Sequence, residues 1–139
     1  MAAEGDLIRQ FINMHLGNVI VEPDWLGSNV VWVTYTGQEE ISLEATHVIV
    51  DAEFIPDEAF YEHPNIVAVI CREKVKKIGD CAFAGSNLRL IVMPGVKIVG
   101  EFAFSRCGAT DVECGKLEII EGYAFIGCNN LRSIKLPSI

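Results

Sequence analysis

The stretch Ile-Pro-Asp-Glu-Ala-Phe at residues 55–60 decides the fold, because close copies of it return three times downstream. The copies read IGDCAF at 78–83, VGEFAF at 99–104 and IEGYAF at 120–125. Their final phenylalanines, spaced 23, 21 and 21 residues apart, are Phe60, Phe83, Phe104 and Phe125. A fixed period of about 22 residues is typical of solenoids, in which each turn of the chain stacks on the next.

Each repeat can be laid out as a strand, a turn, the Ala-Phe element and a turn back. The predicted strands lie at residues 46–50, 66–70, 88–92, 110–114 and 131–136. One such unit cannot cover its own apolar face, so equivalent positions must stack to build a continuous core. We therefore expect the repeated phenylalanines to form a buried ladder. The alanines before them are expected to be small because the chain bends tightly there: Ala59, Ala82, Ala103 and Ala124.

Two segments carry a more specific pattern, RLIVMPGVKIVGEFAFSRC at 89–107 and KLEIIEGYAFIGCNNLRSIKLP at 116–137. They resemble the BspA-like class of leucine-rich repeats, whose units read approximately L-x-x-I-x-L-P, then V-x-x-I-G, then A-F-x-x-C. The resemblance covers roughly residues 41–139. It implies an α/β repeat fold, a leucine-rich-repeat solenoid with one parallel β-sheet and short helical or irregular segments opposite it. It also implies a role in adhesion or protein recognition.

The repeats depart from that pattern in two places. In the first repeat, EHPN at 62–65 replaces the Gly-Cys turn, and Arg72 stands where a proline is common. In the third, Ala109 takes the leucine position and Gly115 the proline position. We expect these departures to alter local packing and to leave the fold unchanged.

Residues 1–40 are predicted to be an N-terminal cap, since the apolar core of a solenoid is exposed to solvent at each end unless another segment covers it. Its elements are a helix at 6–16 and two strands at 19–22 and 30–36, which could form a hairpin. The helix carries one apolar stripe, formed by Leu7, Ile8, Phe11, Ile12 and Leu16. Residues 41–139 would hold about four to five repeats of 21–23 residues, giving a single folded unit overall.

Composition and charge exclude several function classes. Half of the 139 residues are hydrophobic and 22% are charged, as in globular proteins. A formal charge of −8 repels phosphate backbones and anionic lipids, so we expect neither nucleic acid nor membrane as a partner. The first ten residues lack the pattern of a signal peptide, and no apolar run could span a membrane. A cytoplasmic location is the expectation, although BspA-like proteins can also be surface proteins.

The predicted strands offer one face to a partner, because alternate side chains of a strand point to the same side. We expect exposed ladders of His47, Ala68, Leu90, Asp111 and Ser133, and of Ile49, Ile70, Val92, Glu113 and Lys135. The candidate partner-binding residues are Ile49, Ala68, Ile70, Leu90, Val92, Asp111 and Glu113. A contiguous exposed apolar patch marks an interaction site. The alternative is that the N-terminal segment, through Trp25 or Trp32, folds over these residues.

No residue is assigned a catalytic, cofactor-binding or metal-binding role. The five cysteines are odd in number and include no C-x-x-C pair, which favours a reducing compartment over a disulfide framework or a zinc site. Cys107 and Cys128 hold the same repeat position on neighbouring turns of the solenoid, here called rungs. They could form a disulfide or bind a metal together. The favoured interpretation is that each is a small apolar residue that packs inside the turn of its repeat. Cys71 and Cys114 are predicted core residues, and Cys81 is the most exposed thiol. Enzyme activity would require His63 and Cys81 to meet in a cleft.

The main prediction is therefore a non-enzymatic protein–protein interaction module that presents the sheet face to another protein. The alternative is a self-associating structural unit that forms a homo-oligomer through its C-terminal end. There the segment LRSIKLPSI follows the last repeat without a polar capping segment, and terminal repeats normally need a polar outer face. The candidate self-association residues are Leu131, Ile134 and Leu136.

Overall fold

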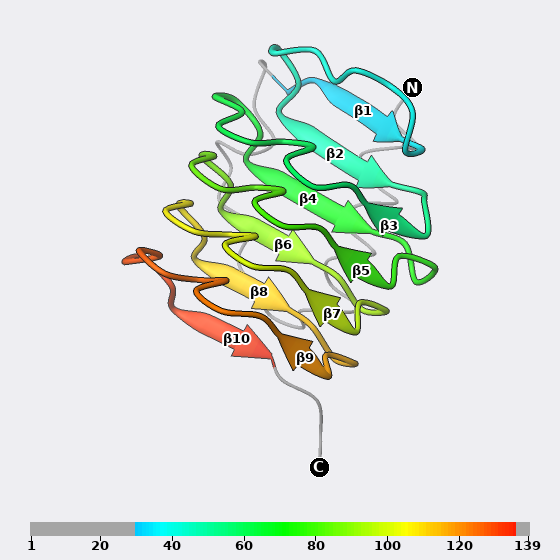
Figure 1. Cartoon of the computed structure of the whole chain (residues 1–139). Coiled ribbons are helices and arrows are strands. Elements are labelled where there is room, and N and C mark those ends of the chain that lie inside the picture. Colours follow the sequence, from blue (N-terminus) through cyan, green and yellow to red (C-terminus); the bar gives the residue numbers. More distant parts are fainter. Residues whose placement is uncertain (1–29, 136–139) are drawn as a thin grey trace.

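A computed structural model of the chain describes residues 30–135, with side chains as far as Arg132. Over this range the chain is a solenoid of parallel β-strands without a helix (Figure 1). The six-stranded sheet has the order β1 (Trp32–Tyr35), β2 (His47–Val50), β4 (Ala68–Cys71), β6 (Leu90–Val92), β8 (Asp111–Glu113) and β10 (Ser133–Lys135). The four-stranded sheet has the order β3 (Phe54–Ile55), β5 (Lys77–Ile78), β7 (Ile98–Val99) and β9 (Ile119–Ile120).

Equivalent repeat positions lie opposite one another in the six-stranded sheet. Val48 pairs with Val69, Val69 with Ile91, and Ile91 with Val112. Parallel strands need a long crossover connection, and from β2 onward each crossover passes through one strand of the four-stranded sheet before it returns. The period of about 22 residues is therefore one full turn of the solenoid.

The predicted phenylalanine ladder is confirmed. The rings of Phe60, Phe83, Phe104 and Phe125 stack with centroid distances of 4.9, 5.3 and 5.2 Å and interplanar angles of 5°, 2° and 13°. The first three rings are buried and the fourth is half-buried. Tyr35 of β1 extends the ladder, because its ring meets Phe60 edge-on at 5.1 Å.

The core lies between the two sheets. From the six-stranded sheet it receives alternate side chains of the strands, such as Val48 and Val50 of β2. From the four-stranded sheet it receives the second residue of β3, β5 and β7: Ile55, Ile78 and Val99 are fully buried. Both sheets thus contribute to one continuous apolar column that includes the phenylalanine ladder.

The return turns contain two left-handed positions in each repeat. The first is occupied by Glu58, Cys81, Phe102 and Tyr123, with φ of 60°, 57°, 55° and 61°. The second is occupied by Glu62, Gly85, Arg106 and Gly127, with φ of 54°, 70°, 52° and 77°. None is β-branched, the type that this conformation tolerates least. Between these two positions, the N–H groups of Phe60, Phe83 and Phe104 each donate to a carbonyl of the next rung, as from Phe60 N to Ala82 O (2.7 Å).

The observed architecture differs in part from the predicted one. The solenoid has two sheets where one was predicted, and within residues 30–135 the segments opposite the main sheet are short strands and turns. The strand predicted at 30–36 is present as β1, but it pairs in parallel with β2 and extends the repeat sheet. The predicted helix at 6–16 and the predicted strand at 19–22 lie outside the described residues. Among the described residues, no helix is long and apolar enough to cross a membrane.

Candidate functional site

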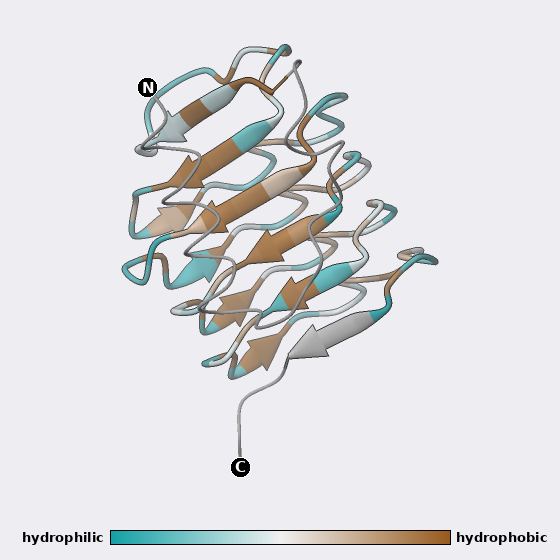
Figure 2. Cartoon of the chain, turned by 180° about the vertical axis from the view of Figure 1, so that it is seen from behind, coloured by the Kyte–Doolittle hydropathy of each residue, from teal (hydrophilic) through white to brown (hydrophobic). Residues whose placement is uncertain are grey.

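The predicted partner-binding residues come together on one face of the six-stranded sheet. Ile49 lies opposite Ile70, Ile70 opposite Val92, and Val92 opposite Glu113. Figure 2 shows apolar colouring along β4 and β6 and along β2 after its hydrophilic start, and hydrophilic colouring at both ends of β8. The predicted exposure of this face is wrong. All seven side chains are at most 9% exposed: Ile49, Ala68, Ile70, Leu90, Val92, Asp111 and Glu113.

The strand sequences supply a physical reason for this burial. HVIV in β2 and AVIC in β4 are apolar at nearly every position, which is typical of parallel strands buried on both faces. The five apolar side chains of this face lie outside the main core column, so they form a second buried layer. Partner binding at these residues stays a prediction, and it requires that the side chains first become accessible.

His47 also belongs to this face and is buried rather than exposed. The ring of Trp32 lies against its imidazole with a centroid distance of 4.4 Å. Trp32 is one of the two tryptophans named for covering the face, but it lies directly opposite His47 in the β1–β2 pairing, so their contact joins neighbouring strands of one sheet. Trp25 lies outside the described residues.

Asp111 and Glu113 were predicted to lie on the exposed ladders, but their exposed fractions are only 6% and 7%. Asp111 accepts a hydrogen bond from Thr110 Oγ1 (2.8 Å) and pairs with Arg132 Nη2 (3.2 Å). Glu113 Oε1 accepts from the Gly115 amide (3.3 Å). These contacts satisfy part of the hydrogen-bonding capacity of the two buried carboxyl groups.

His63 and Cys81 are the two residues that an enzymatic function would require to meet in a cleft. His63 is buried, and its Nδ1 accepts hydrogen bonds from the amides of Asn65 and Ile66, both at 3.2 Å. Its Nε2 therefore carries the proton and donates to Ser42 O (2.9 Å). Cys81 is half-buried in the left-handed turn of its own repeat. Both nitrogens of His63 are thus engaged by backbone groups, which suits a structural role.

The other cysteines agree with the repeat pattern. Cys71 and Cys114 are core residues, as predicted, and burial raises the pKa of both thiols, to about 11 for Cys114. Cys107 and Cys128 are on neighbouring rungs with their sulfur atoms 3.6 Å apart. Within the described part of the chain, no group of three or more His, Cys, Asp or Glu side chains could hold a metal ion.

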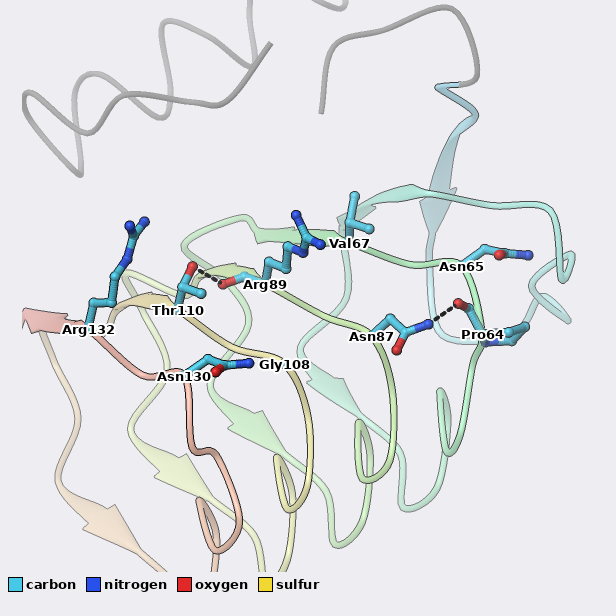
Figure 3. A pocket seen from close by; sticks show the side chains of 9 residues that line it. All are labelled: Pro64, Asn65, Val67, Asn87, Arg89, Gly108, Thr110, Asn130 and Arg132. Carbon is cyan, nitrogen blue, oxygen red and sulfur yellow. Dashed lines mark hydrogen bonds between the residues drawn. The ribbon is translucent and has the colours of Figure 1, made fainter. Parts of the chain in front are cut away.

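A groove of about 910 Å³ runs across the rungs where the strands of the six-stranded sheet begin (Figure 3). One row of lining residues immediately precedes the strands: Val67, Arg89, Thr110 and Arg132. Backbone hydrogen bonds join this row from rung to rung, from Arg89 N to Val67 O (2.9 Å), Thr110 N to Arg89 O (2.8 Å) and Arg132 N to Thr110 O (2.8 Å). The row thereby continues the spacing of the sheet.

A second row of the groove carries amide side chains at Asn65, Asn87 and Asn130, with Gly108 completing the series. Asn65 Nδ2 donates to Leu43 O (2.6 Å), and Asn87 Nδ2 donates to Pro64 O (2.5 Å). These bonds tie each turn to the rung before it. Each amide still has an acceptor oxygen and a second N–H that can reach a ligand.

The charge of the groove differs from that of the whole protein. Among its described lining residues are two exposed arginines, Arg89 and Arg132, and no acid, although the chain carries a formal charge of −8. Figure 3 shows both arginine side chains extending to the same side of the ribbon. Arg132 pairs with Asp111, whereas no ion pair of Arg89 occurs within residues 30–135. The groove is therefore suited to hydrogen-bond acceptors and carboxylates.

The last described rungs expose apolar side chains. Ile120 is 52% exposed, whereas its equivalents Ile55, Ile78 and Val99 are fully buried. Other large exposed side chains near it are Ile119, Tyr123 and Ile126. Of the predicted self-association residues, Leu131 is half-buried, the side chain of Ile134 is not described, and Leu136 lies outside the described residues.

The parallel rungs, the period of about 22 residues and the phenylalanine ladder define a solenoid of the leucine-rich-repeat class. Comparison with family models finds the BspA type leucine rich repeat region, in six copies, over residues 53–139. The chain therefore belongs to the BspA-type leucine-rich-repeat family. Comparisons with curated proteins and with solved structures give no significant match.

Proposed function

We propose that the chain is a non-enzymatic protein-binding module that holds an acidic, extended segment of a partner in the groove of Figure 3. Leucine-rich-repeat solenoids typically act as interaction scaffolds, and this fold is the general support for the class of function. The groove is the specific support. Its two exposed arginines stand among amide side chains on a protein whose overall charge is strongly negative.

The spacing of the arginines favours a particular ligand conformation. Arg89 and Arg132 are two rungs apart, and parallel strands are about 4.8 Å apart, so their backbones are separated by about 10 Å. A polyproline II segment advances about 3.1 Å per residue with three residues per turn, so acids at positions i and i+3 lie on one side, about 9 Å apart. The carbonyl groups of such a segment have no internal partners, and the asparagine amides can donate to them.

The test uses a fluorescent peptide of three Glu-Pro-Pro units and measures its binding by fluorescence anisotropy. We expect Arg89→Gln to weaken binding about tenfold, because a hydrogen bond to a charged group contributes about 1.5–3 kcal/mol. Lys97→Gln makes the same change of charge on an exposed residue outside the groove and should have little effect. The proposal fails if the two variants weaken binding equally, or if a Gln-Pro-Pro peptide binds as well.

The exposed apolar rung favours a second function, self-association of the chain through its C-terminal end. A symmetric dimer would place one copy of this surface against another and bury Ile120. We expect the mass measured by light scattering to rise with protein concentration, and Ile120→Glu to abolish that rise. Phe54→Glu is the matched control, since Phe54 is 57% exposed at the opposite end of the same sheet. A constant monomer mass at all concentrations would exclude this function.

A further inference from the structure

The sulfur atoms of Cys107 and Cys128 lie 3.6 Å apart on neighbouring rungs. Each cysteine follows its ladder phenylalanine by three residues, and the Arg106 N to Ile126 O bond (2.8 Å) joins the two rungs beside them. Chains bonded in this way are about 4.8 Å apart. A disulfide requires Cα atoms about 4.4–6.8 Å apart, so the two rungs need little movement to be bridged.

The two thiols differ in access and in acidity. Cys128 is half-buried and therefore reachable from solvent, whereas only 4% of Cys107 is exposed. The hydrogen bond from the Cys107 thiol lowers the pKa of Cys128 to about 7 and raises that of Cys107. In its protonated form Cys128 donates to Phe104 O (2.9 Å). An accessible, acidic thiol beside a less accessible second thiol is the arrangement found in peroxide-sensitive cysteine pairs.

We propose that Cys107 and Cys128 form a redox site, in which Cys128 is oxidised by a peroxide and Cys107 resolves the product as a disulfide. The Cys128 thiolate attacks the terminal peroxide oxygen, the O–O bond breaks, and hydroxide leaves from hydrogen peroxide, or an alkoxide from an organic hydroperoxide, as a sulfenic acid forms. Cys107 sulfur then attacks Cys128 sulfur, the S–O bond breaks, and the departing hydroxide takes the Cys107 proton. Two thiols lose two electrons in total, and the peroxide is reduced to two waters, or to an alcohol and water.

The remaining cysteines provide an internal comparison. Cys71 and Cys114 are buried in the core. Cys81 is half-buried like Cys128, but burial and the nearby carboxylates of Glu58 and Asp80 raise the pKa of its thiol. Cys107 and Cys128, in contrast, are in direct sulfur–sulfur contact. We therefore expect oxidation to select this pair.

The disulfide would fasten the rung that contains Phe125 to the rung that contains Phe104. The bridge would lie beside the stacked rings of Phe104 and Phe125, which are 5.2 Å apart. The rung it secures leads directly into Leu131 and the groove residue Arg132. Oxidation would thus stabilise both the exposed C-terminal end and one wall of the groove, because a cross-link limits the unfolded chain.

Treatment of the whole protein with hydrogen peroxide, followed by mass spectrometry of tryptic peptides without reductant, tests the proposal. We expect fragment 107–116 to be linked to fragment 117–132 with the loss of two hydrogens. Because 107–116 also contains Cys114, the experiment is repeated with Cys114→Ser, in which the link should persist. A link that disappears in this variant, or faster oxidation of Cys81 than of Cys128, would overturn the assignment.

Two serine variants separate the roles of the two thiols. In Cys107→Ser, we expect Cys128 to accumulate as a sulfenic acid that dimedone traps, since nothing resolves it. In Cys128→Ser, peroxide should leave Cys107 largely unmodified. The thermal unfolding midpoint of the unaltered protein should rise on oxidation, and that of Cys107→Ser should not. Equal trapping of Cys107 and Cys128 in the two variants would contradict the proposed order of attack.

Discussion

Replacing Phe104 by alanine should lower the free energy of unfolding by about 3–5 kcal/mol, the usual cost of truncating a buried phenylalanine. Its ring is fully buried and stacks on Phe83 at 5.3 Å and on Phe125 at 5.2 Å. The substitution therefore opens a cavity in the middle of the aromatic ladder and separates the rungs on either side. Urea denaturation, followed by circular dichroism, measures the loss.

Phe102→Ala is the matched control, because Phe102 lies in the same turn two residues earlier and is 37% exposed. Its ring stacks on Tyr123 at 5.3 Å outside the core. We expect this variant to lose only about 0.5–1.5 kcal/mol, the contribution of an aromatic pair. Equal losses for the two phenylalanines would show that the ladder does not carry the stability of the solenoid.

Replacing Gly95 by alanine should cost about 1–3 kcal/mol, the usual effect of overfilling a packed site. A Cβ at Gly95 would overlap the carbonyl group of Glu73 on the preceding rung, with its carbonyl carbon only 2.8 Å away. Because the obstructing atoms belong to the backbone, no side-chain rotation can relieve the overlap. The urea midpoint of the variant should fall accordingly.

Gly108→Ala provides the comparison for Gly95. The nearest atom to a Cβ at Gly108 is Leu88 O at 3.4 Å, an ordinary contact. Alanine at such a site restricts the unfolded chain and leaves the folded one unstrained, so its effect should be neutral or a stabilisation of about 0.4–1 kcal/mol. If both alanine variants unfold at the same urea concentration, then the close approach of two rungs at Gly95 does not explain why glycine occupies this position.

The repeat architecture was predictable because the same physical requirement recurs four times. Each Ala-Phe element needs the neighbouring one to bury its ring, so the spacing of the phenylalanines predicted the ladder and the stacking of strands. Tyr35 was missed because it precedes Phe60 by 25 residues and belongs to no recognisable repeat. The four-stranded sheet was missed because strands of two residues are too short to show an alternating pattern.

The functional surfaces were harder to predict. Alternation along β4 and β6 identified correctly which residues share the outer face, but alternation does not reveal whether that face is covered. The groove was missed because Asn65, Asn87 and Asn130 are ordinary turn residues. Their period of about 22 residues was the available signal, together with the arginines that precede β6 and β10.

The rung-to-rung hydrogen bonds have a mechanical consequence. They join both sheets and the left-handed turns, from Phe60 N to Ala82 O, Phe83 N to Ala103 O and Phe104 N to Ala124 O, so adjacent rungs are held around much of their circumference. Each of these bonds runs along the stacking axis. A force applied at the C-terminal end therefore acts on the hydrogen bonds of one rung at a time. The chain should unfold rung by rung, and each step should release about 22 residues.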